Sequence, residues 1–215
     1  MGGHEYDSAV SILRAAETIG YKVALATSCR FRNRSAIPGH WPVYPVFPAK
    51  SPRQFRLTAG NCMTLDGGKL PDAARPTPPR QPGRLLEDGL AALLTLSRRR
   101  WIARFARVCR RLFAELNLRR GDHAFFETIH PLELVGLARF LADSPESQQV
   151  DWHLQVHEDP FDGETSGEAD PQETESALRC QFDHILRRLP NHALHFYNPS
   201  ESLAARFSQL GVVRF

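Results

Sequence analysis

The chain has no apolar run long enough to cross a bilayer, and Met1 is followed by polar residues rather than by the apolar core of a signal peptide. Cysteine is scarce, and no two cysteines have the spacing of a metal knuckle or a redox dithiol. These absences argue against a membrane-spanning, zinc-binding or disulfide-rich secreted protein. We expect a cytoplasmic chain whose four cysteines are reduced: Cys29, Cys62, Cys109 and Cys180.

A large excess of one charge is also absent, because the net charge is only +3. Two opposed blocks nearly cancel: residues 98–120 hold nine arginines and one acid, and residues 158–175 hold eight acids and no basic residue. Overall charge therefore gives no argument for nucleic-acid binding.

What the sequence does contain is an alternation of helical and extended patterns. Glycine and proline mark most of the boundaries, and Asp7 or Ser8, and later Asn198, are expected helix caps. The patterns predict helices over 7–19, 85–118, 131–141, 172–189 and 200–210, and strands over 21–28, 43–47, 123–128, 152–157 and 193–198, with a further strand opening at 212–215.

This order predicts an α/β fold: a Rossmann-like, mostly parallel sheet with helices on both faces. Three prolines move the strand 43–47 to a sheet edge, and the long helix has candidate breaks near Gly89 and Ser97. We expect a single domain over 1–215, with a Pro/Gly/Arg-rich excursion at about 66–84.

Near the N-terminus, Gly2 and Gly3 precede a polar segment that includes His4. Glycine permits close backbone approach, and the free N–H groups of a helix's first turn favour anions and polar ligands. A ligand-facing loop that leads into a helix is one interpretation, and a flexible chain end is the other.

Ligands of an open parallel sheet gather beyond the carboxyl ends of its strands. Polar residues follow the predicted strands there, without the clustering of a metal site, and they suit a hydroxylated ligand. They are Thr27, Ser28, Arg30, Glu127, Thr128, His130, His157, Glu158, Asp159, Asn198 and Ser200.

Among them, His157 ends a strand and is followed by two acids, so it is the candidate catalytic base. A structural, hydrogen-bonded histidine is the alternative. His153 is expected to pack within the sheet, and His123 and His195 have no partner visible in the sequence.

The arginine-rich helix carries an apolar stripe at Trp101, Phe105, Val108, Leu112 and Leu116. Its simplest interpretation is a surface helix that packs on the sheet with solvated arginines. Contact with an anionic membrane or a partner protein stays open, and no nucleic-acid motif is present.

Three segments resemble the N-terminal half of a GT-B glycosyltransferase, and most closely the large retaining group called family four. The segments are Gly2–Ser8, Trp152–Glu158 and His195–Glu201.

The resemblance implies two Rossmann-like domains with the active site between them, a nucleotide-sugar donor and a glycan or small-molecule acceptor. It implies that Gly2 and Gly3 approach the donor phosphates or the acceptor, and that His157 lies beside the transferred sugar. Glu127–Thr128 and Asn198–Ser200 would line the acceptor side, and no metal or other cofactor is implied.

Family members have a strand before the glycine loop, and here only Met1 precedes it. A donor-binding domain also follows in the family, so we expect this half to need such a domain or a partner chain. The glycine loop is then expected to be mobile. A non-catalytic module that uses the arginine-rich helix on the inner membrane face or on a partner protein is the alternative.

Overall fold

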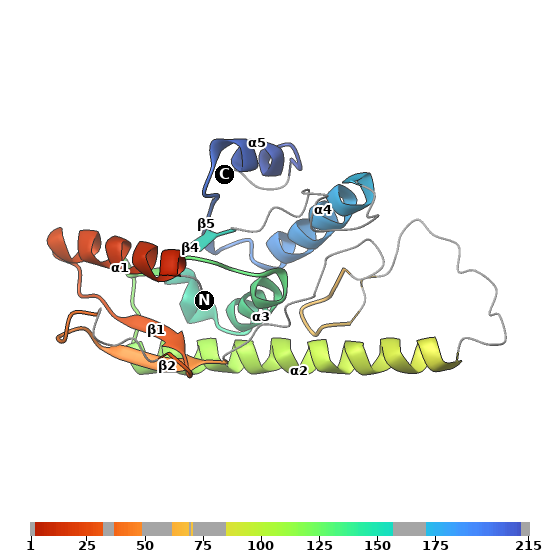
Figure 1. The fold of residues 1–215 in the computed structure, drawn as a ribbon, viewed down its shortest axis with the longest axis horizontal. Coiled ribbons are helices and arrows are strands. Elements are labelled where there is room, and N and C mark those ends of the chain that lie inside the picture. Colours follow the sequence, from red (N-terminus) through yellow and green to blue (C-terminus); the bar gives the residue numbers. More distant parts are fainter. Residues whose placement is uncertain are drawn as a thin grey trace.

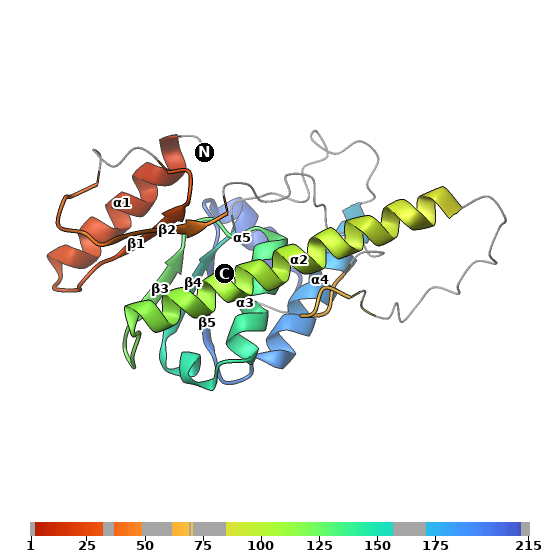
Figure 2. The same cartoon turned by 90° about the horizontal axis from the view of Figure 1, so that it is seen from below.

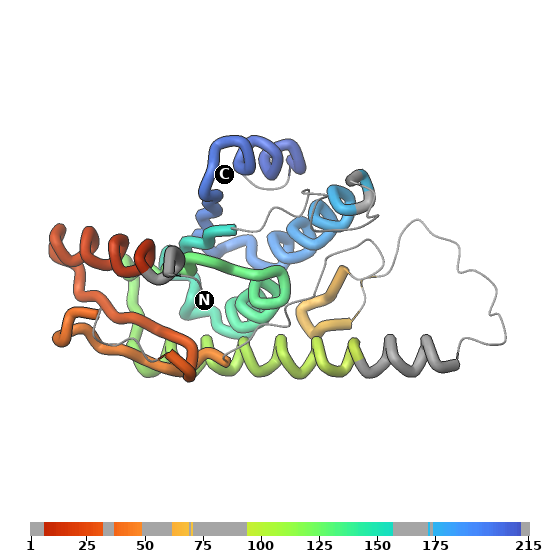
Figure 3. The backbone as a smooth tube through the Cα atoms, viewed as in Figure 1, coloured from red at the N-terminus to blue at the C-terminus, as the bar shows by residue number. Residues whose placement is uncertain are grey.

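The computed structural model describes residues 3–31, 37–48, 62–68, 70, 85–156 and 171–211 (Figure 3). It confirms the α/β fold class with parallel strands (Figure 1). The strands are β1 (Leu25–Ser28), β2 (Val43–Phe47), β3 (His123–Phe126), β4 (Asp151–Gln155) and β5 (Ala193–Tyr197). The helices are α1 (Gly3–Thr18), α2 (Leu85–Leu116), α3 (Pro131–Ala142), the 3-10 turn η3 (Pro145–Gln149), α4 (Pro171–Arg188) and α5 (Glu201–Ser208).

The first helix begins earlier than the sequence predicts. Asp7 was the expected cap, but its carbonyl oxygen lies inside α1 and accepts a bond from Ser11 Oγ at 2.7 Å. Nothing between Gly3 and Asp7 stops a helix, because glycine costs only about 1 kcal/mol there and no proline intervenes. Gly3 is therefore helical, and the loop predicted at this residue is wrong.

Strands β1 and β2 form a small parallel sheet of their own, in which Pro45 is exposed at an edge as predicted. With α1 they make an N-terminal unit that has a separate core around Val10, Ile37 and Trp41. Glu17 ties this unit together, because its carboxylate accepts bonds from His40 at 2.7 Å and Trp41 at 3.0 Å.

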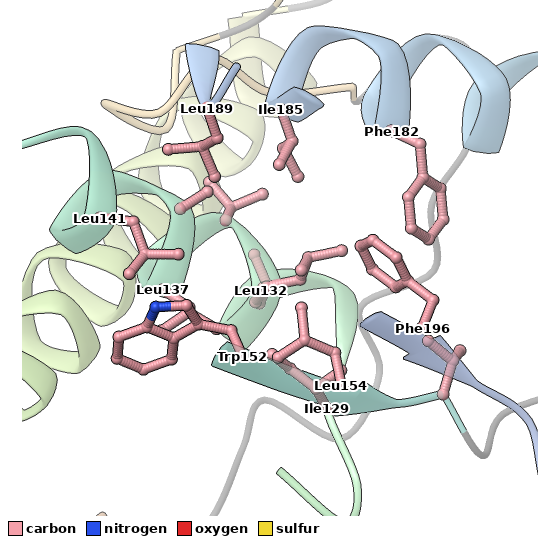
Figure 4. Packing of buried hydrophobic residues seen from close by; sticks show 14 of the residues in the cluster. Ile129, Leu132, Leu137, Leu141, Trp152, Leu154, Phe182, Ile185, Leu189 and Phe196 are labelled. Carbon is pink, nitrogen blue, oxygen red and sulfur yellow. The ribbon is translucent and has the colours of Figure 1, made fainter. Parts of the chain in front are cut away.

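The second sheet has the order β3-β4-β5, with both pairs parallel. Parallel strands laid down in sequence order by right-handed crossovers place every connecting helix on the same face. Accordingly, α3 and α4 both pack on the face that carries Trp152 and Leu154 (Figure 4).

The main core lies between this face and the helices α2, α3 and α4. Helix α2 runs unbroken past Gly89 and Ser97 and lies against α3 (Figure 2). The segment just before the expected excursion also enters the core. Met63 is buried, and Gln181 of α4 clamps its backbone with two bonds of 2.8 and 2.9 Å.

At the C-terminal end, Asn198 was the expected cap of the last helix, and Ser200 takes this role instead. The hydroxyl of Ser200 accepts a bond from Leu203 N at 3.3 Å, so α5 begins at Glu201. The strand expected at 212–215 and most of the excursion, 71–84, lie outside the described residues.

In the described part of the chain, no helix combines the length and the apolar character needed to cross a membrane.

Candidate functional site

The carboxyl edge of the β3-β4-β5 sheet is held together by bonds that continue beyond the strands. Ile129 N donates to Gln155 O at 3.0 Å, and Val156 N donates to Tyr197 O at 2.8 Å. Thr128, after β3, and Asn198, after β5, therefore lie on the same edge, on either side of the end of β4.

Asn198 is oriented by the end of β4. Its Nδ2 donates to Val156 O at 2.8 Å, which leaves Oδ1 as an acceptor. Asn198 Oδ1 and Thr128 Oγ1 are both shielded from solvent, and neither has a hydrogen-bond partner among the residues that the structure describes. Buried polar atoms without partners are rare in folded proteins. This edge thus holds unused capacity for hydrogen bonds.

The other predicted site residues are divided between this edge and other places. Glu127 is half-buried directly after β3, and Ser200 is exposed and caps α5. Gly3 and His4 form the first turn of α1. His157 and Glu158, together with Gly2, lie outside the described residues, so the catalytic prediction stays untested.

A second cluster, which the sequence patterns did not predict, occupies the sheet face opposite α3 and α4. His153 on β4 is in register with Phe125 on β3 and with His195 on β5. The rings of His153 and His195 stack at 4.8 Å, and His123 lies 5.2 Å from His153. Phe125 and Tyr197 are 37% and 42% exposed, so this face is open.

Four side chains of this face form one hydrogen-bonded chain. Tyr21 Oη lies 3.4 Å from His123 Nε2, and His123 Nδ1 lies 2.9 Å from His153 Nε2. His153 Nδ1 is then 2.9 Å from Tyr197 Oη. We call Tyr21, His123, His153 and Tyr197 the imidazole chain.

The electrostatics of this face act on His153, at its centre. Asp151 is the carboxylate here, 3.3 Å from His195 Nε2 and 4.0 Å from His123 Nδ1. Burial lowers the pKa of His153, and the neighbouring His195 and His123 lower it further, against the opposing effect of Asp151. The neutral form of His153 is therefore favoured.

No group of three or more histidine, cysteine, aspartate or glutamate side chains within the described residues is arranged to hold a metal ion. In the imidazole chain, His123 and His153 turn their facing nitrogens toward each other rather than toward a common point. What these groups can do chemically is exchange protons with one another and with a ligand.

The sequence held a signal for this cluster. Aligning the alternating apolar residues Ala124, Trp152 and Leu194 as neighbours places histidines on the opposite face of all three strands. No partner of His123 or His195 was visible in the sequence because their partners come from other strands.

Fold and edge together define a class, an α/β chain with parallel sheets and a polar carboxyl edge. Beyond the class, comparison with protein-family models, curated proteins and solved structures finds no match to this chain.

Proposed function

We propose that this chain is the acceptor-binding domain of a glycosyltransferase, and that it takes a hydroxylated ligand at the carboxyl edge of β3-β4-β5. The observation that supports binding there is the unfilled hydrogen-bonding capacity of Thr128 Oγ1 and Asn198 Oδ1. Asn198 Oδ1 can only accept, so its partner must donate, as a sugar hydroxyl does.

The transfer reaction in this proposal comes from the sequence resemblance. In it, a donor domain or partner chain supplies the nucleotide sugar on the cytoplasmic side of the membrane, and His157 serves the reacting centre. Glu127 and Ser200, which flank the edge, are the next residues expected to meet the acceptor.

The binding step is testable by protein-detected NMR with neutral mono- and disaccharides. We expect a sugar to shift the amide signals of Ile129, Val156 and Asn198. Thr128→Val and Asn198→Ala should each weaken binding roughly tenfold, because each removes a hydrogen bond at a water-poor site. Thr18→Val is the matched control in α1, and it should bind as the wild type does.

Shifts confined to other parts of the chain would contradict the site. The assignment of this chain to the acceptor side, with the donor bound elsewhere, has its own test. A nucleotide sugar titrated into this chain alone should release no binding heat. Tight binding of the nucleotide sugar would contradict the assignment to the acceptor side while leaving the edge itself intact.

A further inference from the structure

The outer face of α2 is rich in exposed arginine side chains. Arg100, Arg104 and Arg107 are exposed, and within the described part of the chain none of them makes a salt bridge or a hydrogen bond. From Leu96 to Ala114 the helix contains no acid. We call Arg100, Arg104 and Arg107 the arginine stripe.

Helical geometry places the stripe on one line. At 100° per residue, positions 100, 104 and 107 fall within about 60° of arc, and 1.5 Å of rise per residue spreads them over roughly 10 Å. Arg111 extends the line, although Glu115 lies 3.5 Å away from its guanidinium.

The opposite face of α2 holds the stripe rigidly. Ile102, Phe105 and Cys109 are buried against the core, where α2 packs on α3. Among the described elements, β2 lies beside α2 at Val108, Arg111 and Glu115, and no helix or strand covers the rest of the outer side of α2 (Figures 1 and 2). The exposed arginines are thus held on a helix that is fixed by its packing against the core.

Exposed leucines favour a lipid surface over a nucleic acid as the occupant. Leu96 is 48% exposed, and it lies one turn before Arg100 on the same face; Leu94 is equally exposed nearby. Basic residues beside apolar ones are typical of helices that lie on anionic membranes. The sugar–phosphate backbone of a nucleic acid offers no apolar surface that an exposed leucine could contact.

We propose that the outer face of α2 docks this chain on an anionic membrane surface, with the arginine stripe on lipid phosphates and Leu96 at the acyl boundary. This site is separate from the carboxyl edge and does not depend on the proposed function. Because the main apolar face of α2 is buried in the core, binding is chiefly electrostatic and is weakened by salt.

Co-sedimentation of the full chain with vesicles tests this inference. We expect binding to mixed phosphatidylcholine–phosphatidylserine vesicles, none to phosphatidylcholine alone, and release as the salt rises from about 0.1 M to about 1 M. Each arginine near an anionic surface raises partitioning roughly fivefold. Arg100→Gln/Arg104→Gln/Arg107→Gln should therefore lower binding about 100-fold.

Arg14→Gln/Arg120→Gln/Arg188→Gln is the matched control, since it removes the same charge from exposed positions elsewhere. It should retain most of the binding, and circular dichroism should show both triple variants folded. An equal loss in the control would reduce the effect to net charge and overturn the docking face.

Leu96→Ser separates lipid from nucleic acid. We expect it to weaken vesicle binding roughly fivefold by removing an apolar contact. If the chain instead binds a labelled oligouridine more tightly than the vesicles, and Leu96→Ser changes neither, the surface is a nucleic-acid site and the membrane inference is wrong.

Discussion

At the residue scale, His153 is the most constrained titratable group of the open sheet face. It donates to or accepts from neighbours on both sides, and it stacks on His195 at 4.8 Å. Its lowered pKa means that folding favours the neutral ring. Burial lowers the pKa of His184 and His192 in the same direction.

These shifts predict how stability depends on pH. A histidine whose pKa is lower in the folded state contributes stability above the unfolded-state pKa of about 6.5 and loses it as the pH falls through the folded value. We expect the free energy of unfolding, measured in urea, to fall below about pH 6.5. The slope reaches at most about 1.4 kcal/mol per pH unit for each extra proton bound by the unfolded chain.

The variant His153→Gln isolates one of the three contributions. It removes a titrating ring with a lowered pKa, so its stability should depend less steeply on pH than that of the wild type. An identical slope in the two proteins would show that His153 keeps its ordinary pKa in the folded chain.

At the scale of elements, the contact between α2 and α3 depends on a glycine. A Cβ added at Gly136 of α3 would lie 3.0 Å from Phe105 Cβ and 3.2 Å from the Ile102 carbonyl oxygen. The two helices therefore approach so closely here that an added Cβ would force the neighbouring atoms to move by a few tenths of an ångström. Helix propensity alone would favour alanine by about 1 kcal/mol.

We predict that packing wins over propensity at this position. Gly136→Ala should destabilise the chain by roughly 1–3 kcal/mol, the usual cost of an overpacked core, as measured by urea unfolding. Gly39→Ala is the control, because a Cβ there meets nothing within 4 Å, and it should be nearly neutral. A stabilised Gly136→Ala variant would mean that α2 and α3 separate easily.

At the scale of the whole molecule, the N-terminal unit and the three-stranded sheet have separate cores. Phe47 of β2 connects them, because its ring stacks on Phe105 of α2 at 5.3 Å. The contact of Tyr21 with His123 is a second and more polar connection.

Removing the apolar connection should loosen one unit and spare the other. In Phe47→Ala we expect faster hydrogen exchange at the β1 amides, such as Ala26 and Thr27, and unchanged exchange at Leu154 in β4. The stacked pair and the lost burial together are worth about 1–3 kcal/mol. Equal acceleration in both units would show that the chain unfolds as a single cooperative body.

Sequence patterns located the helices and strands of this molecule better than they predicted which of these elements contact one another. Trp101, Phe105 and Leu112 recur at helical spacing, so α2 was predictable from its own residues. Likewise, Pro131 marked the start of α3 through its fixed φ angle and missing N–H. Both features act within a few residues of the chain.

The division of the strands into two sheets, and the meeting of His123, His153 and His195, depend on contacts between distant segments. A register shift of one residue would move every histidine to the opposite face. For the carboxyl edge, the sequence predicted Thr128 and Asn198 as the last residues of their strands, and in the structure they follow β3 and β5. The bond that orients Asn198, from its amide to Val156, needed the structure.

The imidazole chain also constrains which nitrogen of each ring carries hydrogen. If His123 Nδ1–H donates to His153 Nε2, then neutral His123 accepts from Tyr21, and His153 donates through Nδ1 to Tyr197. If the bond runs the other way, both rings carry hydrogen on Nε2. Whenever both rings are neutral they therefore share one tautomer, and a ligand that binds the hydroxyl of Tyr197 would then set the proton position at Tyr21, two rings away.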